Sequence, residues 1–200
     1  MTWTHLIAFN LTLLAAMAVP GPALLYALRQ SIAGGLRTGM ATGAGLALVA
    51  AGWTAAALLG LDLVFRLFPS AFLSVKIAGA LYLIWVAMQL WRGAETPVKD
   101  TAHPGARAFL GGVLVNLANP KSVLFAASVL VVIFPPDLSL VAKLGIALNH
   151  LVVELLVYSA FAALLSTPQA RAAYLRGKPR IDRVAALVLG ALGLRLLISR

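Results

Sequence analysis

The chain has 200 residues, of which 62% are hydrophobic and only 11% are charged. Ordinary soluble domains are about 45–50% apolar and about 25% charged, so the composition excludes this class and predicts an integral membrane protein. The absence of cysteine excludes disulfides, thiol redox chemistry and cysteine-ligated metal sites. The three histidines are scattered along the sequence, so we expect neither a metal nor another cofactor.

The net charge of +10 is compatible with nucleic-acid binding or with a membrane topology signal. Basic residues interleaved with aromatic residues, which would indicate nucleic-acid binding, do not form a patch in the sequence. Lysine and arginine gather instead near the ends of apolar segments, as in membrane proteins that follow the positive-inside rule. We therefore expect membrane lipids as partners and no nucleic acid.

Six apolar segments follow one another along the chain. They comprise residues 6–28, 40–61, 72–91, 109–134, 138–165 and 184–198. Because a helix needs about 20 apolar residues to cross a bilayer, the pattern predicts an all-α, polytopic membrane protein with six transmembrane helices. The first segment has no basic leader and extends beyond signal-peptide length, so we expect it to be retained.

The connections between these segments differ in basic character. Those after the first, third and fifth segments contain most of the lysine and arginine residues. The positive-inside rule places these three connections in the cytoplasm and both termini in the periplasm. The two longest connections are polar and contain Pro and Gly: residues 92–108 are interpreted as a linker between two halves, and residues 166–183 as a basic anchor.

Pro20, Gly21 and Pro22 interrupt the first apolar segment. Proline has no backbone N–H and pushes the preceding residue out of the helical region, so a helix drawn through this sequence must break. In a bilayer such a break is tolerated only where it is buried in protein or lines a wet cavity. Asn119, Pro120 and Lys121 interrupt the fourth segment in the same way. The two breaks are predicted to mark the working centre of the protein.

The two halves of the chain show weak internal similarity. A shift of 100 residues lays residues 18–27 on 118–127, and two further short matches occur in the same order. The repeat unit would contain three helices, and an odd number inverts the direction of the second unit. We therefore predict two inverted three-helix repeats, residues 1–91 and 109–200, joined by the cytoplasmic linker 92–108.

Inverted repeats of this kind place the substrate near the bilayer midplane, at broken helices from equivalent positions. The half-helices that begin at the breaks would present free N–H groups and positive dipole ends, which favour an anionic group such as a carboxylate. Asn116 and Asn119 share a helix face, and they either bind substrate or hydrogen-bond carbonyls freed by the break. The predicted substrate pathway consists of Pro20, Gly21, Pro22, Asn116, Asn119, Pro120 and Lys121.

Two ionisable side chains lie deep in predicted spans. A charge there costs about 2.5–3.5 kcal/mol on insertion scales, so Lys121 either serves the substrate or snorkels to the cytoplasmic surface. Glu154 shares a helix face with His150 and Tyr158, one turn before and after it, and these three are candidates for proton coupling. Glu154 is a proton carrier, a counter-charge for Lys121, or both. We expect Lys121 and Glu154 to meet directly, or through substrate or water.

With the two breaks, a glycine run at Gly39, Gly43 and Gly45, and the sequence of residues 79–83, the chain resembles the LysE/RhtB family of small amino-acid exporters over essentially its whole length. The resemblance implies a bacterial inner-membrane exporter of amino acids or close derivatives, driven by the proton motive force. Family members often have an acidic residue just after the glycine run, whereas residues 45–61 of this chain contain no ionisable side chain. The glycines themselves are interpreted as packing residues.

The sequence therefore predicts a secondary exporter of a small zwitterionic or anionic metabolite, and an amino acid is the preferred substrate. A non-transporting membrane scaffold or subunit is the alternative, but it would need neither paired helix breaks nor buried charges. An enzyme is not expected, because no nucleophile or metal constellation is recognisable. A homodimer is compatible with this prediction.

Overall fold

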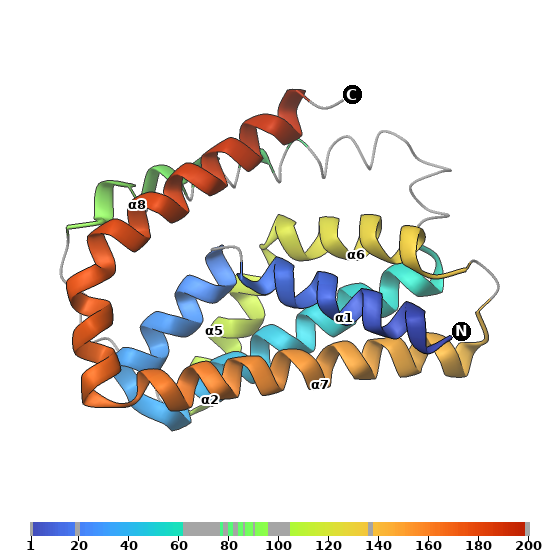
Figure 1. Cartoon of the computed structure of the whole chain (residues 1–200), viewed down its shortest axis with the longest axis horizontal. Helices are drawn as coiled ribbons and strands as arrows, with labels where there is room; N and C mark the ends of the chain where they lie inside the picture. The colour runs from blue at the N-terminus through green and yellow to red at the C-terminus, as the bar shows by residue number, and fades with distance from the viewer. Residues whose placement is uncertain are drawn as a thin grey trace.

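The computed structural model describes four long stretches of the chain and some positions between them. These are residues 2–18, 21–61, 105–135 and 138–198, with positions 77, 80–81, 84–85, 87–89 and 91–95. All regular structure in them is helical, which confirms the all-α prediction (Figure 1). The elements are α1 (Trp3–Ala18), α2 (Pro22–Ala56), the π-helical turn η1 (Ala57–Leu61), α5 (Gly105–Leu117), α6 (Pro120–Ile133), α7 (Leu140–Leu165) and α8 (Pro168–Ile198).

Two helical stretches are long and apolar enough to cross a membrane, Pro22–Gly60 and Leu140–Leu165. A third span results if Gly105–Leu117 and Pro120–Ala126, which meet at 62°, are taken together. Trp3–Ala18 is apolar but shorter. The described residues thus fit a helical membrane protein. The six-span count stays a prediction, since the third predicted segment lies largely outside the described residues.

The break in the fourth predicted segment is confirmed. Asn119 is extended (φ −90°, ψ 102°) between α5 and α6, and Pro120 occupies the first turn of α6. Proline suits this position because its missing N–H would have no intrahelical partner there. In the first predicted segment, α1 ends at Ala18 and α2 begins at Pro22. The sequence therefore located both interruptions correctly.

The boundary between the first two predicted segments is wrong. Residues 29–39, predicted as a polar connection, are helical on both sides of Gly35, whose φ of 71° lies in the left-handed region that glycine adopts readily. A Cβ on Gly39 would lie 3.0 Å from Cβ of Ser31, although eight residues of straight helix would separate them by about 12 Å. The chain therefore turns back on itself at Gly35 without a loop.

The connection predicted at residues 166–183 is also wrong, because α8 already begins at Pro168. Pro179 lies inside this helix. Because proline has no backbone N–H, the Leu175 carbonyl loses the hydrogen bond that it would accept from residue 179. Figure 1 shows α8 bending partway along its length. Its later part packs against the third predicted segment, since a Cβ on Gly190 would lie 3.7 Å from Cβ of Ala87.

Glycines allow α2 to lie close to both α5 and α7. A Cβ on Gly45 would overlap the backbone carbonyl of Phe109 in α5, and one on Gly43 would lie 2.5 Å from Cβ of Tyr158 in α7. These contacts confirm the interpretation of the glycine run as packing residues. They also bring the candidate Tyr158 against the middle of α2.

The two broken elements run in opposite directions (Figure 1). α1 runs from the N-terminus toward the middle of the molecule, and the first arm of α2 continues away from it. α5 runs back toward the middle, and α6 continues toward the end where the N-terminus lies. α1, α6 and α7 pack together through a core cluster of Phe9, Leu13, Ala126, Leu130, Phe134 and Ile146.

Candidate functional site

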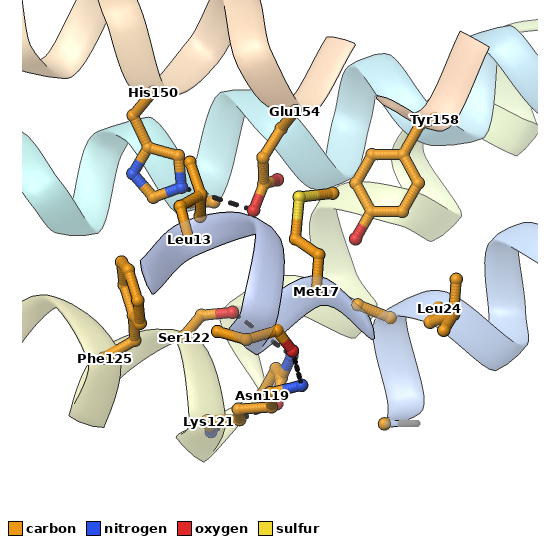
Figure 2. A pocket seen from close by; sticks show the side chains of 14 residues that line it. Leu13, Met17, Leu24, Asn119, Lys121, Ser122, Phe125, His150, Glu154 and Tyr158 are labelled. Atoms are coloured by element: carbon orange, nitrogen blue, oxygen red, sulfur yellow. Dashed lines mark hydrogen bonds and ion pairs between the residues drawn. The ribbon is translucent and has the colours of Figure 1, made fainter. Parts of the chain in front are cut away.

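A pocket lies where the two breaks meet α7 (Figure 2). The empty space between its lining residues is about 470 Å³, and part of that space is open to the surroundings. It is lined by Leu13, Ala16, Met17, Gly21, Ala23, Leu24, Ala50, Asn119, Lys121, Ser122, Phe125, His150, Glu154 and Tyr158. The lining is mainly apolar, and a few polar groups converge on it from α6 and α7.

Most predicted site residues reach this pocket, namely Gly21, Asn119, Lys121, His150, Glu154 and Tyr158. Pro22 and Pro120 stand at the starts of the two helices that open beside it. Asn116 lies behind the pocket and bonds residues that line it. Pro20 lies outside the described residues.

Asparagines build the start of α6. The side-chain oxygen of Asn119 accepts a hydrogen bond from the Lys121 amide at 3.1 Å, which caps the helix. Asn116 donates to the carbonyl of Leu46 in α2 and accepts from the hydroxyl of Ser122. Asn116 thus bonds a backbone carbonyl of another helix, whereas Asn119 caps the helix that follows it.

Lys121 joins the two breaks. Its ammonium donates a hydrogen bond to the carbonyl of Ala16, in the last turn of α1. In a continuous helix that carbonyl would accept from residue 20, but proline has no N–H to give. A cation at this place also suits the negative end of the α1 dipole. The Lys121 side chain is partly buried and lines the same pocket as Glu154.

The predicted face of α7 is buried and hydrogen-bonded. His150 Nδ1 lies 2.7 Å from the hydroxyl of Thr54 in α2, and His150 Nε2 lies 3.3 Å from Oε1 of Glu154. The other carboxylate oxygen, Oε2, is buried and has no hydrogen-bond partner among the described residues. Figure 2 shows Glu154 between His150 and Tyr158, with its carboxylate directed toward the pocket.

Two polar residues of the site were missed by sequence reasoning. Thr54 is the only hydroxyl residue between positions 45 and 61, so its isolation in an apolar span was a usable signal. Ser122 directly follows Lys121 and could have been found by its position. The edge contacts of Phe9 and Phe125 with the His150 ring, at centroid distances of 5.6 and 5.9 Å, have no signal in the sequence.

Comparison with known proteins decides the family. The LysE type translocator family matches residues 14–200. The chain belongs to this family. This translocator is 30% identical over 195 residues to the threonine efflux protein of Escherichia coli (strain K12), with 94% of each chain covered. It is 32% identical over 188 residues to the homoserine/homoserine lactone efflux protein of Salmonella typhi, with 88% of this chain and 86% of the relative covered.

The uncharacterized membrane protein YahN of Escherichia coli (strain K12) is 32% identical over 187 residues, which cover 89% of this chain and 82% of that protein. No solved structure matches the chain. The family assignment confirms the resemblance found in the sequence, and it makes the protein a translocator rather than an enzyme. The family and its efflux relatives together support the predicted amino-acid exporter.

Proposed function

We propose that this translocator exports a small amino acid, of the size of threonine or homoserine, and that the substrate binds in the pocket between the two helix breaks. The observation that supports this most is the meeting of both breaks, Lys121 and Glu154 at one cavity. A scaffold would gain nothing from opening two helices and placing two opposite charges at the same cavity, since each feature costs stability in a membrane.

Lys121 is the proposed partner of the substrate carboxylate. Its side chain lines the pocket and is held beside the end of α1 by the hydrogen bond to the Ala16 carbonyl, so a basic group stands where a carboxylate could bind. The start of α2 adds a second attraction, since Gly21 offers no side-chain cap and the following residues line the pocket. Free N–H groups and a positive dipole end at such a helix start favour an anion.

The proposed architecture has two inverted three-helix repeats, residues 1–91 and 109–200, with the linker 92–108 between them. The opposite directions of the two broken elements support it (Figure 1). So does the proline that begins the helix after each break, Pro22 in α2 and Pro120 in α6. An inverted pair would allow one half to move against the other around a fixed site, as alternating access requires.

The proposed location is the bacterial inner membrane with both termini in the periplasm, and the proposed driving force is the proton motive force. The hydrogen-bonded series Thr54, His150 and Glu154 supports this coupling, because imidazole and carboxyl groups can exchange protons near neutral pH. Tyr158, one turn further along α7, lines the same pocket. The homodimer stays a prediction.

Counterflow in proteoliposomes tests the function. Vesicles that contain the purified chain and unlabelled L-threonine or L-homoserine should accumulate the labelled amino acid from outside. Lys121→Met should reduce this exchange to the level of empty vesicles, because the carboxylate would lose its cation. Lys143→Met, which replaces a lysine that does not line the pocket, is the matched control and should exchange normally. If the native chain inserts but exchanges no member of a full amino-acid panel, the scaffold alternative is favoured.

A further inference from the structure

The Oε2 atom of Glu154 is a buried acceptor that the described residues do not satisfy. The residue is only 7% exposed. Its Oε1 atom lies 3.3 Å from His150, whereas Oε2 has no hydrogen-bond partner among the described residues. Leaving a buried charged oxygen without a donor is costly, and native proteins rarely do so without a functional reason. The donor for this oxygen is therefore expected to come from the contents of the pocket.

The charges around Glu154 define what that donor can be. From α6 the pocket receives Lys121, and from α7 it receives His150 and Tyr158 beside Glu154 itself. The lining residues of α1 and α2 contribute no titratable side chain. Besides His150 and Tyr158, the lining therefore offers one basic and one acidic side chain, on different helices. Such a pair complements a ligand with both charges better than a ligand with one.

We propose that Oε2 of Glu154 binds the α-ammonium group of the exported amino acid, and that a proton occupies the same carboxylate when the substrate has left. This inference rests on the proposed function, and it assigns the second end of the substrate. The carboxylate lies toward Lys121 and the start of α2, and the ammonium group lies toward α7. Leu13, Met17 and Phe125 complete the pocket with apolar surface, which suits a small uncharged side chain.

Competition for one carboxylate would couple the substrate to protons. When the ammonium group of the substrate binds, the proton on the Glu154 carboxyl group leaves for the solvent. The carboxylate therefore holds either the proton or the ammonium group, but not both. By linkage, a bound proton must then weaken substrate binding by the same factor by which substrate weakens proton binding. A carrier with this property exchanges an outgoing zwitterion for an incoming proton. His150, which Thr54 orients, is the positioning residue that holds Oε1 and leaves Oε2 directed toward the pocket.

Calorimetric titration of the purified full chain in nanodiscs, with L-threonine and L-homoserine as probes, tests the shared site. Titrations between about pH 5 and pH 9, in buffers of different ionisation enthalpy, would count the protons released. We expect the apparent Kd to rise by up to about tenfold for each unit that the pH falls, with up to one proton released for each bound amino acid. Binding without proton release over this whole range would overturn the inference.

Variants and analogues test the ammonium contact. Glu154→Gln should weaken binding about 100-fold, a typical result of truncating one partner of a buried charge pair, and should abolish its pH dependence. Glu154→Asp should retain part of both properties, and Glu95→Gln, outside the pocket, should bind as the native chain does. N-acetyl-L-threonine, which has no ammonium group, should not compete with L-threonine for the native chain.

The outcomes separate this inference from the proposed function. Native binding by Glu154→Gln, or competition by N-acetyl-L-threonine as strong as that by unlabelled L-threonine, would overturn the ammonium site while leaving the exporter intact. If the native chain shows neither binding nor counterflow of any amino acid, the proposed function is contradicted, and this inference with it. If Glu154→Gln does not fold, the analogue competition and the proton count on the native chain still decide.

Discussion

Two buried carboxylates, Asp182 in α8 and Glu154 in α7, have opposite surroundings. Asp182 is fully buried, and its Oδ2 atom lies 2.9 Å from the Lys178 ammonium and 3.6 Å from the Arg29 guanidinium. Lys178 also donates to the carbonyls of Gly93 and Ala94 at 2.8 and 2.9 Å. Around Asp182 the protein supplies the counter-charges itself, and the cluster fastens α8 to α2 and to the start of the predicted linker 92–108.

Among the described residues, Glu154 has a hydrogen-bond partner on one of its two oxygens, and Glu154 lines a cavity. Both carboxylates are buried and both have oxygens without a hydrogen-bond partner among the described residues, but Asp182 lies against two cations of the protein, whereas Glu154 lies beside a cavity. A carboxylate whose partners are fixed holds elements together, whereas one with unused binding capacity beside a pocket can serve something that arrives and leaves. Substitutions at the two positions should accordingly affect different properties of the protein.

The largest effect on stability is expected for Asp182→Asn. It leaves the buried Lys178 ammonium and the Arg29 guanidinium without their counter-charge, which should cost about 3 kcal/mol of unfolding free energy. Export by the remaining folded protein should be unaffected. Glu154→Gln should show the reverse, with native-like stability and impaired binding. Thermal unfolding in detergent, together with counterflow, measures both, and equal destabilisation by the two variants would contradict the distinction.

Tyr174→Phe should have a smaller effect that depends on pH. Burial, and then the negative charge of Asp182, raise the pKa of the Tyr174 phenol above its ordinary value of 10.0, against an opposing effect of Arg29. The folded protein thus holds the phenol proton more tightly than the unfolded chain does. This stabilisation is complete below about pH 10 and is lost as the pH rises through the raised pKa.

Melting curves between about pH 8 and pH 11 check this prediction. The melting temperature of the native chain should fall more steeply above about pH 10 than that of the Tyr174→Phe variant, while the two should run parallel at lower pH. A constant difference over the whole range would show that Tyr174 does not report on the charge cluster.

The smallest effect is expected for Glu95→Gln. Glu95 pairs with Arg183 at the surface, where the two side chains are 76% and 48% exposed. Exposed ion pairs contribute little, so the variant should lose no more than about 0.5 kcal/mol of unfolding free energy. A loss comparable to that of Asp182→Asn would mean that the connection between α8 and residues 91–95 depends on surface charge rather than on the buried cluster. Thermal unfolding of the two variants in parallel makes the comparison.

Errors in the sequence prediction fell at helix boundaries. Residues 29–39 are predicted as a connection because they separate two apolar segments and contain Arg29 and Arg37, yet the chain turns at Gly35 and the residues on both sides of it are helical. Residues 166–183 are predicted as a polar connection with Pro and Gly that acts as a basic anchor. The structure keeps residues 168–183 helical, and Asp182 and Lys178 contact other parts of the chain from successive turns of that helix. Such contacts stabilise a helix that local composition disfavours.

The sequence by itself determined the membrane class, the two helix breaks and the shared face of His150, Glu154 and Tyr158. These properties follow from apolar length, from the missing N–H of proline and from helical periodicity, which act within a few residues. Only the tertiary structure decided which groups meet. Lys121 contacts the Ala16 carbonyl across 105 positions, and Thr54 contacts His150 across 96. No local rule specifies such pairs, because they depend on how the helices pack, and that packing leaves one oxygen of Glu154 directed toward the pocket.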